Sequence, residues 1–500
     1  ATIPEVLPPQ HKGKQGYRLR LEPGAISVAQ RLRQVGYRTL MSGKWHLGDR
    51  PQDLPNAHGF DQSFALDASG ADNWDDKSYM PYYDHAPWYE NGKATTYPSG
   101  RYSSTVIIDK MVDYLKASDP AQPFLAYVAF QAVHIPVQAP KAFSDHYKGR
   151  FDGGWDALAK ARFERAKAGG LLPVDAAPPQ WPKSLRRWDA LTPAEQKLQS
   201  RAMEVYAGMI EAMDHEIGRL HAHLAATGQL ANTVWIVTSD NGPEPTDPSA
   251  QRGFDLWARL HGYHHRLEDL GERGSHNWIG PEWAAAVATP GHLFKFYTGE
   301  GGLRVPLIIA GPQVQGGVRT GASAFVTDIT PTLLEWAGAG PAPAGAKPII
   351  GRSLVPILNG TADRIYAEAD GFGVEVSGNS AYFQGDYKLV RIQPPYGDAR
   401  WRLFDLSKDP GETRDLSAQL PAVFVSMQQA YAAYAKANGV LDLPAGYQVQ
   451  QQVARNAWQR QLQLYGWKIG LMVIGLCAGF ALVLHFRAKR RANLKGGEAA

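Results

Sequence analysis

The chain of 500 residues contains one cysteine, Cys477, which lies in an apolar run near the carboxyl end. This scarcity excludes intrachain disulfides, thiolate metal sites and a cysteine nucleophile in the soluble part of the chain. A large excess of charge of one sign is also lacking, because the formal net charge is only +4. Nucleic acid is therefore not an implied partner.

The opening residues, A-T-I-P-E-V-L-P-P-Q, lack an initiating methionine and a basic stretch followed by an apolar one. We expect that the natural chain begins further upstream. The composition, with 44% hydrophobic and 20% charged residues, is that of a globular protein large enough to bury a substantial core.

The central stretch is V-W-I-V-T-S-D-N-G, residues 234–242. A short β-branched and aromatic run predicts a buried strand, and it ends in a turn that carries Asp240 and Asn241. In open α/β sheets ligands bind at the carboxyl ends of the strands. A carboxylate and an amide oxygen suit Ca²⁺ or Mg²⁺, although the same triplet also forms ordinary turns.

Three further basic positions follow predicted strands or glycine turns. Tyr37–Met41 is a predicted strand, and Lys44 and His46 come two apart behind it, on one side if the backbone stays extended. His134 follows the buried-strand candidate at 124–130. Each of these residues alone also has an ordinary explanation in a loop.

Lys295 precedes a glycine-rich turn and a third predicted strand at 305–310. Together with Asp240 and Asn241, these positions predict one pocket with a divalent cation, two lysines and two histidines. Such a pocket suits a sulfate or phosphate ester, since cations neutralise the non-bridging oxygens and a histidine protonates the leaving alcohol.

Other histidines and one aspartate are expected to be structural. Four histidines between residues 253 and 289 match no zinc spacing and are predicted to be solvated loop residues: His261, His264, His265 and His276. Asp328 is predicted to cap a helix. Residues 49–104 and 140–195 are predicted to be surface loops without regular structure.

The helical periodicity of residues 206–224, directly before the central strand, predicts an α/β fold with a mostly parallel central sheet flanked by helices. We expect this domain at 1–350 and a smaller antiparallel-sheet subdomain at 351–443. A linker at 444–466 is expected to lead to a transmembrane helix at 467–486 and a basic cytoplasmic tail at 487–500.

The motifs S-G-K-W-H-L-G, V-T-S-D-N-G and K-F-Y-T-G-E-G-G-L-R-V-P resemble those of the type I sulfatases, the arylsulfatase family of the alkaline phosphatase superfamily. The resemblance extends over about residues 1–420 in the same order and includes W-I-G-P-E-W at 278–283. It implies a sulfuric ester hydrolase that cleaves aryl, alkyl or carbohydrate sulfates.

The resemblance also implies roles for individual residues. Asp240 and Asn241 are similar to calcium ligands, with Mg²⁺ or Mn²⁺ less expected, and Lys44 and Lys295 to sulfate-binding residues. His134 resembles the proton donor to the leaving group. His46 resembles a residue that orients a formylglycine diol, the family's nucleophile.

The chain departs from the family at the nucleophile. Formylglycine is made by a maturation enzyme from Cys or Ser in C/S-x-P-x-R, and no such motif occurs in residues 1–500. In the family this motif and an aspartate pair on the first strand lie upstream of the part that resembles residues 1–20. We therefore expect a core that is open along one side, where the first strand is missing.

The expected protein is a sulfate-ester hydrolase anchored in a bacterial inner membrane with its catalytic domain in the periplasm. Two alternatives remain open from the sequence. One is a phosphonate or phosphodiester hydrolase of the same superfamily, and the other is a catalytically inactive, membrane-anchored binding protein.

Overall fold

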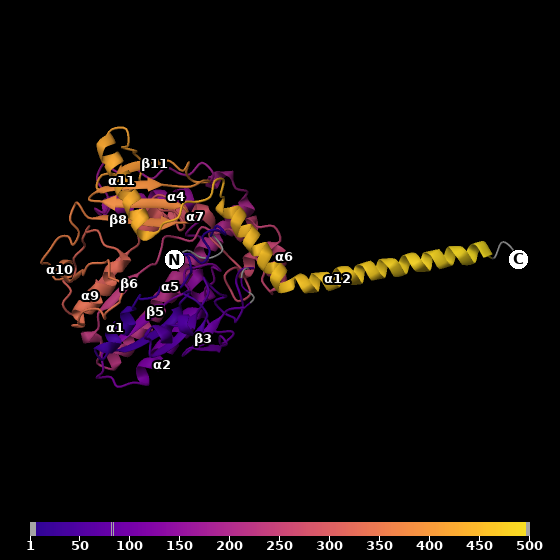
Figure 1. The fold of residues 1–500 in the computed structure, drawn as a ribbon, viewed down its shortest axis with the longest axis horizontal. Helices are drawn as coiled ribbons and strands as arrows, with labels where there is room; N and C mark the ends of the chain where they lie inside the picture. Colours follow the sequence, from indigo (N-terminus) through magenta and orange to yellow (C-terminus); the bar gives the residue numbers. More distant parts are fainter. Residues whose placement is uncertain (1–6, 82, 84, 497–500) are drawn as a thin grey trace.

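A computed structural model describes residues 7–81, 83 and 85–496. A globular body holds nearly all the strands and helices, and one long helix, α12, projects from it toward the carboxyl end (Figure 1). The strands form three separate sheets.

The largest sheet has five strands in the order β4-β3-β2-β1-β5. Their bounds are β1 Arg38–Lys44, β2 Gln62–Leu66, β3 Trp88–Glu90, β4 Lys93–Thr95 and β5 Phe124–Ala129. β1 pairs in parallel with β2 and β5, whereas β2 with β3 and β3 with β4 are antiparallel. The prediction of a mostly parallel sheet is therefore corrected to a mixed one.

Helices cover both faces of this sheet. Leu40 packs on one face with side chains of α2 (Ser103–Lys116) and α5 (Pro193–Ala226). The next residue, Met41, packs on the opposite face with Ala29 of α1 (Val28–Gln34). This alternation is the period of a strand that is buried on both sides.

The predicted strands at 234–238 and 305–310 form a sheet of their own. β6 (Trp235–Thr238) pairs antiparallel with β7 (Leu307–Ala310), and neither pairs with β5. An apolar cavity of about 2030 Å³ separates β5 from β6. Its other walls come from α1, α5 and α9 (Ile329–Trp336).

This cavity explains why three predicted buried strands are incompletely buried. The side chains of Tyr127, Val237 and Ile308 are 47%, 40% and 60% exposed. The strands form where the β-branched and aromatic runs predict them, but the space beside them is not filled.

Two regions predicted as irregular loops contain structure. Residues 49–104 provide β2, which lies beside β1 in the sheet. Residues 140–195 contribute α3 (Lys141–Ser144) and α4 (Gly154–Ala168), together with Trp155 and Trp188, which pack against Trp283 in the main core. Local strand and helix propensity did not reveal the structure of these two regions, because aromatic packing between segments that are distant in the sequence stabilises it.

Three of the four histidines at 261–276, all but His264, pack on aromatic rings, although the stacked His265 remains exposed. His276 is 1% exposed, and its Nε2 lies 2.8 Å from the carbonyl oxygen of Tyr79. His265 stacks on Trp278 with ring centroids 4.4 Å apart. The region also holds the short helices α6 (Phe254–Leu260) and α7 (Gly280–Ala288).

Asp328 is structural, as predicted. It is fully buried, and its carboxylate accepts hydrogen bonds from the backbone N–H groups of Phe325 (2.7 Å) and Arg352 (2.9 Å). It fixes the start of α9 against the following loop, which includes α10 (Val355–Leu358).

The carboxyl-terminal subdomain is an antiparallel sheet in the order β11-β10-β9-β8, with α11 on it. The bounds are β8 Gly371–Val376, β9 Asn379–Gln384, β10 Tyr387–Arg391, β11 Trp401–Asp405 and α11 Pro421–Asn438. Helix α12 (Val449–Gly496) then runs through both the predicted linker and the predicted membrane segment.

Among the described residues, no single helix meets the length and hydropathy expected of a membrane span. One bent pair of segments within α12, Gln451–Lys468 and Val473–Lys489, meets it jointly, with an angle of 48° between them. The last four residues of the basic tail predicted at 487–500 lie outside the described residues.

Candidate active site at the strand ends

The predicted site residues come together at one end of the large cavity. Lys44 is the last residue of β1, His134 follows β5, and Asp240 follows β6. These three residues, Asn241 and Lys295 all line the same cavity. The carboxyl ends of the strands thus meet where the sequence predicts a pocket.

Lys44 is a cation without a partner. No ion pair or hydrogen bond of its ammonium group is present among the residues that the structure describes. Burial, and then the like charge of Lys295, lower its pKa to about 8. A desolvated ammonium group of this kind is stabilised by an incoming anion.

His46 does not continue the extended backbone of β1. The strand ends at Lys44, and His46 adopts a left-handed conformation with φ 54°. Burial lowers its pKa to about 3, and the charges of Lys44, His134 and Lys295 contribute in the same direction. His46 therefore lies near the basic cluster as a neutral ring, although the extended geometry assumed for it is wrong.

Glu244 is the site residue that sequence reasoning missed. Its Oε2 accepts a hydrogen bond from Lys295 Nζ at 2.5 Å and lies 3.2 Å from His134 Nε2. Burial alone raises the pKa of Glu244, but the charge of Lys295 and the contacts with His134 outweigh it and hold the pKa well below its usual range. The sequence feature that could have indicated Glu244 is its position three residues after Asn241.

His134 has an acceptor at each ring nitrogen. Its Nδ1 lies 2.8 Å from the carbonyl oxygen of Ile135, which requires a hydrogen on Nδ1. In the neutral ring Nε2 is then an acceptor, so the contact with Glu244 becomes a hydrogen bond only when Nε2 takes up a proton. Burial and the charge of Lys295 nevertheless lower the pKa of His134, so this proton is readily given up.

Asp240 and Asn241 lie side by side at the end of β6. The Nδ2 of Asn241 donates to Asp240 Oδ1 at 2.8 Å, which leaves Asn241 Oδ1 and a carboxylate oxygen for other ligands. These hard oxygens fit calcium, which takes 6–8 oxygen ligands, but they are only part of such a shell. Among the described residues, no group of three or more His, Cys, Asp or Glu side chains is arranged to hold a metal ion.

The loop that carries Lys295 packs closely against the turn after β6. Lys295 N–H donates to the carbonyl oxygen of Pro243 at 3.1 Å, and Gly242 N–H donates to that of Gly302 at 3.0 Å. A Cβ on Gly242 would lie 1.9 Å from the carbonyl oxygen of Gly301. Glycine at these positions therefore permits the approach that brings Lys295 to Glu244.

A buried ion triad ties this loop to the carboxyl-terminal subdomain. Lys388 of β10 is fully buried, and its Nζ lies 2.8 Å from Glu300 Oε1 and 2.9 Å from Glu412 Oε1. Glu412 also accepts from the backbone N–H of Glu300 at 2.8 Å. Glu300 begins α8 (Glu300–Leu303), so the subdomain fixes the glycine loop behind Lys295.

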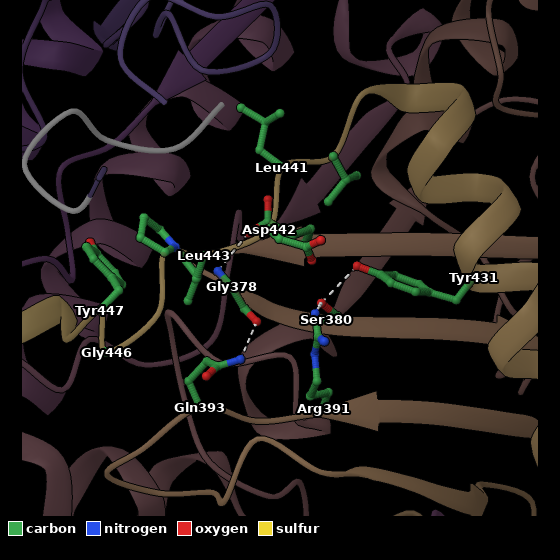
Figure 2. A pocket seen from close by; sticks show the side chains of 13 residues that line it. Gly378, Ser380, Arg391, Gln393, Tyr431, Leu441, Asp442, Leu443, Gly446 and Tyr447 are labelled. Atoms are coloured by element: carbon green, nitrogen blue, oxygen red, sulfur yellow. Dashed lines mark hydrogen bonds between the residues drawn. The ribbon is translucent and has the colours of Figure 1, made fainter. Parts of the chain in front are cut away.

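A second pocket of about 300 Å³ lies away from the strand ends, between the carboxyl-terminal sheet and the loop at 440–447. The hydroxyl of Tyr431 donates to Ser380 Oγ at 2.8 Å, and the amide of Gln393 donates to the carbonyl of Gly378 at 2.9 Å. Both hydrogen bonds are drawn in Figure 2. None of the predicted site residues lines it, and its polar groups bond largely to one another.

The chain is also similar to known proteins. A family model described as Sulfatase matches residues 15–339. An uncharacterized sulfatase of Schizosaccharomyces pombe is 33% identical over 449 residues, which cover 86% of this chain and 80% of that protein. An arylsulfatase of Klebsiella aerogenes is 34% identical over 359 residues, which cover 69% of this chain and 75% of that protein.

Solved structures share the fold. One protein, in complex with its substrate D-glucosamine-2-N,6-O-disulfate, superposes with a TM-score of 0.53 at 19% identity, covering 86% of this chain and 85% of its own. Another, in complex with k-i-k-neocarrahexaose, has a TM-score of 0.54 at 21% identity, covering 81% and 73%.

The chain belongs to the sulfatase family, whose relatives support the hydrolysis of sulfate esters. The resemblance inferred from the three motifs is confirmed at this level.

Proposed function

We propose that the strand-end pocket binds the sulfate group of a sulfate monoester between Lys44 and Lys295. The observation that carries the proposal is the ammonium group of Lys44, which is half-buried, unpaired among the described residues, and close enough to Lys295 for their charges to interact. Two cations on one cavity wall lower the free energy of an anion that leaves water to bind there.

His134 supplies the proton in this proposal. A proton on Nε2 is held by Glu244 and released to the leaving oxygen when the ester bond breaks. His46, neutral at working pH, packs beside the lysines and adds no charge of its own.

Calcium is the proposed metal, with Asp240 and Asn241 as two of its ligands. When bound there, the ion would neutralise charge on the sulfate oxygens. Among the described residues, no group of three or more His, Cys, Asp or Glu side chains is arranged to complete the shell.

We further propose that a segment upstream of Ala1 supplies the formylglycine nucleophile and the first strand of the sheet. The motif that is modified is not present in residues 1–500, so these residues do not fit that group and no catalytic step is assigned to it here. The cavity between the unpaired edges of β5 and β6 supports the proposal, since it is apolar and bordered by strands.

The proposed location is the periplasmic face of a bacterial inner membrane, with α12 as the anchor. Large apolar side chains of α12 such as Leu476 and Phe480 are 67% and 66% exposed, and basic residues follow them. A maturation enzyme for the nucleophile is the proposed partner.

Relatives point to carbohydrate or aryl sulfates as the substrate class. One relative from Bacteroides thetaiotaomicron is named N-acetylglucosamine-6-O-sulfatase and is 26% identical over 442 residues.

The test is to express the complete gene, including the DNA upstream of Ala1, and to measure hydrolysis of 4-nitrophenyl sulfate and bis(4-nitrophenyl) phosphate with calcium. Faster hydrolysis of the sulfate supports the proposal. Preference for the phosphodiester favours the phosphonate and phosphodiester class instead. Calcium-dependent stabilisation without turnover of either ester favours a binding protein.

A further inference from the structure

The carboxylate of Glu244 is a fixed negative charge inside the anion pocket. Its Oε1 accepts hydrogen bonds from the backbone N–H of Thr246, at 3.1 Å, and from the Thr246 hydroxyl. Its Oε2 faces Lys295 Nζ and His134 Nε2. Donors on both oxygens hold the side chain in one position, and it is only 10% exposed.

Glu244 changes the charge that the pocket offers to a ligand. The Lys295–Glu244 ion pair is formed already, with a separation of 2.5 Å. Lys44 has no such partner among the described residues. The positive charge of Lys295 is therefore already balanced by Glu244, and Glu244 repels any additional negative charge on a ligand.

We propose that Glu244 is a specificity-determining residue, which makes the pocket accept ester anions with one negative charge and reject doubly charged phosphate monoesters. Sulfate monoesters and phosphodiesters carry one charge, whereas a phosphate monoester carries two above its second pKa of about 6. Repulsion by a fixed charge grows in proportion to the charge of the ligand, so it acts more strongly on the dianion.

This inference rests on the proposed function, because it assumes that the ester anion binds at this pocket. The probes are 4-nitrophenyl sulfate, bis(4-nitrophenyl) phosphate and 4-nitrophenyl phosphate. Their dissociation constants are measured by calorimetry on the chain of residues 1–500 at about pH 8, where the last ligand is a dianion. Binding needs no nucleophile.

The deciding variant is Glu244→Gln, which keeps the shape and removes the charge. The expected result is a gain of at least about tenfold in affinity for 4-nitrophenyl phosphate relative to 4-nitrophenyl sulfate, or ~1.4 kcal/mol. The affinity for bis(4-nitrophenyl) phosphate should change by the same factor as the affinity for 4-nitrophenyl sulfate. A change in this ratio of less than about twofold overturns the inference.

Matched controls separate charge from packing. Glu244→Asp keeps the charge and should leave the ratio as in the wild type. Glu216→Gln removes a buried glutamate charge on α5, where Glu216 pairs with Arg219 outside the site, and should also leave it unchanged. A ratio that shifts equally in the Glu216 variant overturns the inference, because net charge alone would then explain it.

A second measurement needs no variant and remains valid if Glu244→Gln does not fold. For the wild type, lowering the pH from about 8 to about 5 protonates 4-nitrophenyl phosphate to a monoanion. Its affinity relative to the sulfate should then rise, and a constant ratio overturns the inference. If the wild type binds none of the three esters, the proposed function itself fails, which is distinct from binding with an unchanged ratio.

Discussion

At the scale of single residues, Lys44 shows a conflict between stability and binding. Its ammonium group is desolvated at the end of β1 and lacks a counter-ion among the described residues, so folding makes it less favourable to keep the proton. Such a residue weakens the folded state unless an anion binds, as expected of a binding residue rather than a structural one.

We predict that Lys44→Met stabilises the ligand-free chain by roughly 1–3 kcal/mol at pH 7, while it abolishes binding of 4-nitrophenyl sulfate. Denaturant unfolding and calorimetry measure the two effects. Lys197→Met, at an exposed lysine of α5, is the matched control and should change neither by more than about 0.5 kcal/mol. Loss of stability in Lys44→Met would contradict the account.

The same lysine predicts a pH dependence of stability. Its pKa is lowered from 10.5 to about 8 in the folded chain, so between these values the unfolded chain holds the proton and the folded chain does not. The free energy of unfolding contributed by Lys44 therefore rises with pH through this window. The slope of stability against pH should be smaller there in Lys44→Met, and an identical slope would exclude this cause.

His46 gives a third prediction at this scale. Burial lowers its pKa to about 3, so its ring should stay neutral from about pH 5 to pH 9. NMR of the ring protons, assigned by comparison with His46→Gln, checks this, and a titration near pH 6.5 would show that the ring is more solvated than the structure has it.

The sequence predicted most of the site residues but not the contacts between them. Lys44, His134 and Asp240 follow strands, Lys295 precedes a glycine turn, and all four line one cavity, as these local signals predict. Glu244 was missed, because its position three residues after Asn241 does not reveal the contact with Lys295, which is 51 residues away. The conformation of His46 was also missed, since a left-handed residue after a strand leaves no trace in hydropathy.

At the scale of elements, the buried triad of Lys388, Glu300 and Glu412 joins β10 to α8. Removing one member of a buried ion pair leaves an uncompensated charge in the interior. The strands themselves were predictable from β-branched and aromatic runs. Their partition into a mixed sheet and a separate β6–β7 pair was not, because pairing is decided by contacts between distant segments.

We predict that Lys388→Met destabilises the chain by about 3–5 kcal/mol, measured by denaturant unfolding. Lys408→Met is the matched control. Lys408 also pairs with a carboxylate, Asp405, at 2.9 Å, but its side chain is 78% exposed, so its loss should cost less than about 1 kcal/mol. Equal effects in the two variants would show that the triad does not hold the glycine loop.

At the scale of the whole molecule, the surface of the globular body differs from the apolar surface of α12. The body is globular, and α12 projects from it (Figure 1). Large apolar side chains along the outer part of α12 are exposed. The sequence predicted a span at 467–486 from its apolar length, but it did not indicate that the helix begins at Val449 and runs, with a bend of 48°, to Gly496.

We predict that the whole chain floats with phospholipid vesicles in a density gradient, whereas a chain that ends at residue 466 stays at the bottom. The physical reason is the transfer of the apolar side chains of α12 into the hydrocarbon layer. The truncated chain should unfold at the same denaturant concentration as the whole chain, and equal flotation of both would contradict the membrane anchor.

The central claim is that the sulfate group binds at the strand ends between two lysines. A crystal structure of the chain with 4-nitrophenyl sulfate tests it most directly. The account predicts sulfate oxygens within hydrogen-bond distance of Nζ of both Lys44 and Lys295, with the ester oxygen facing His134. A sulfate group bound elsewhere, with Lys44 still unpaired, would contradict it.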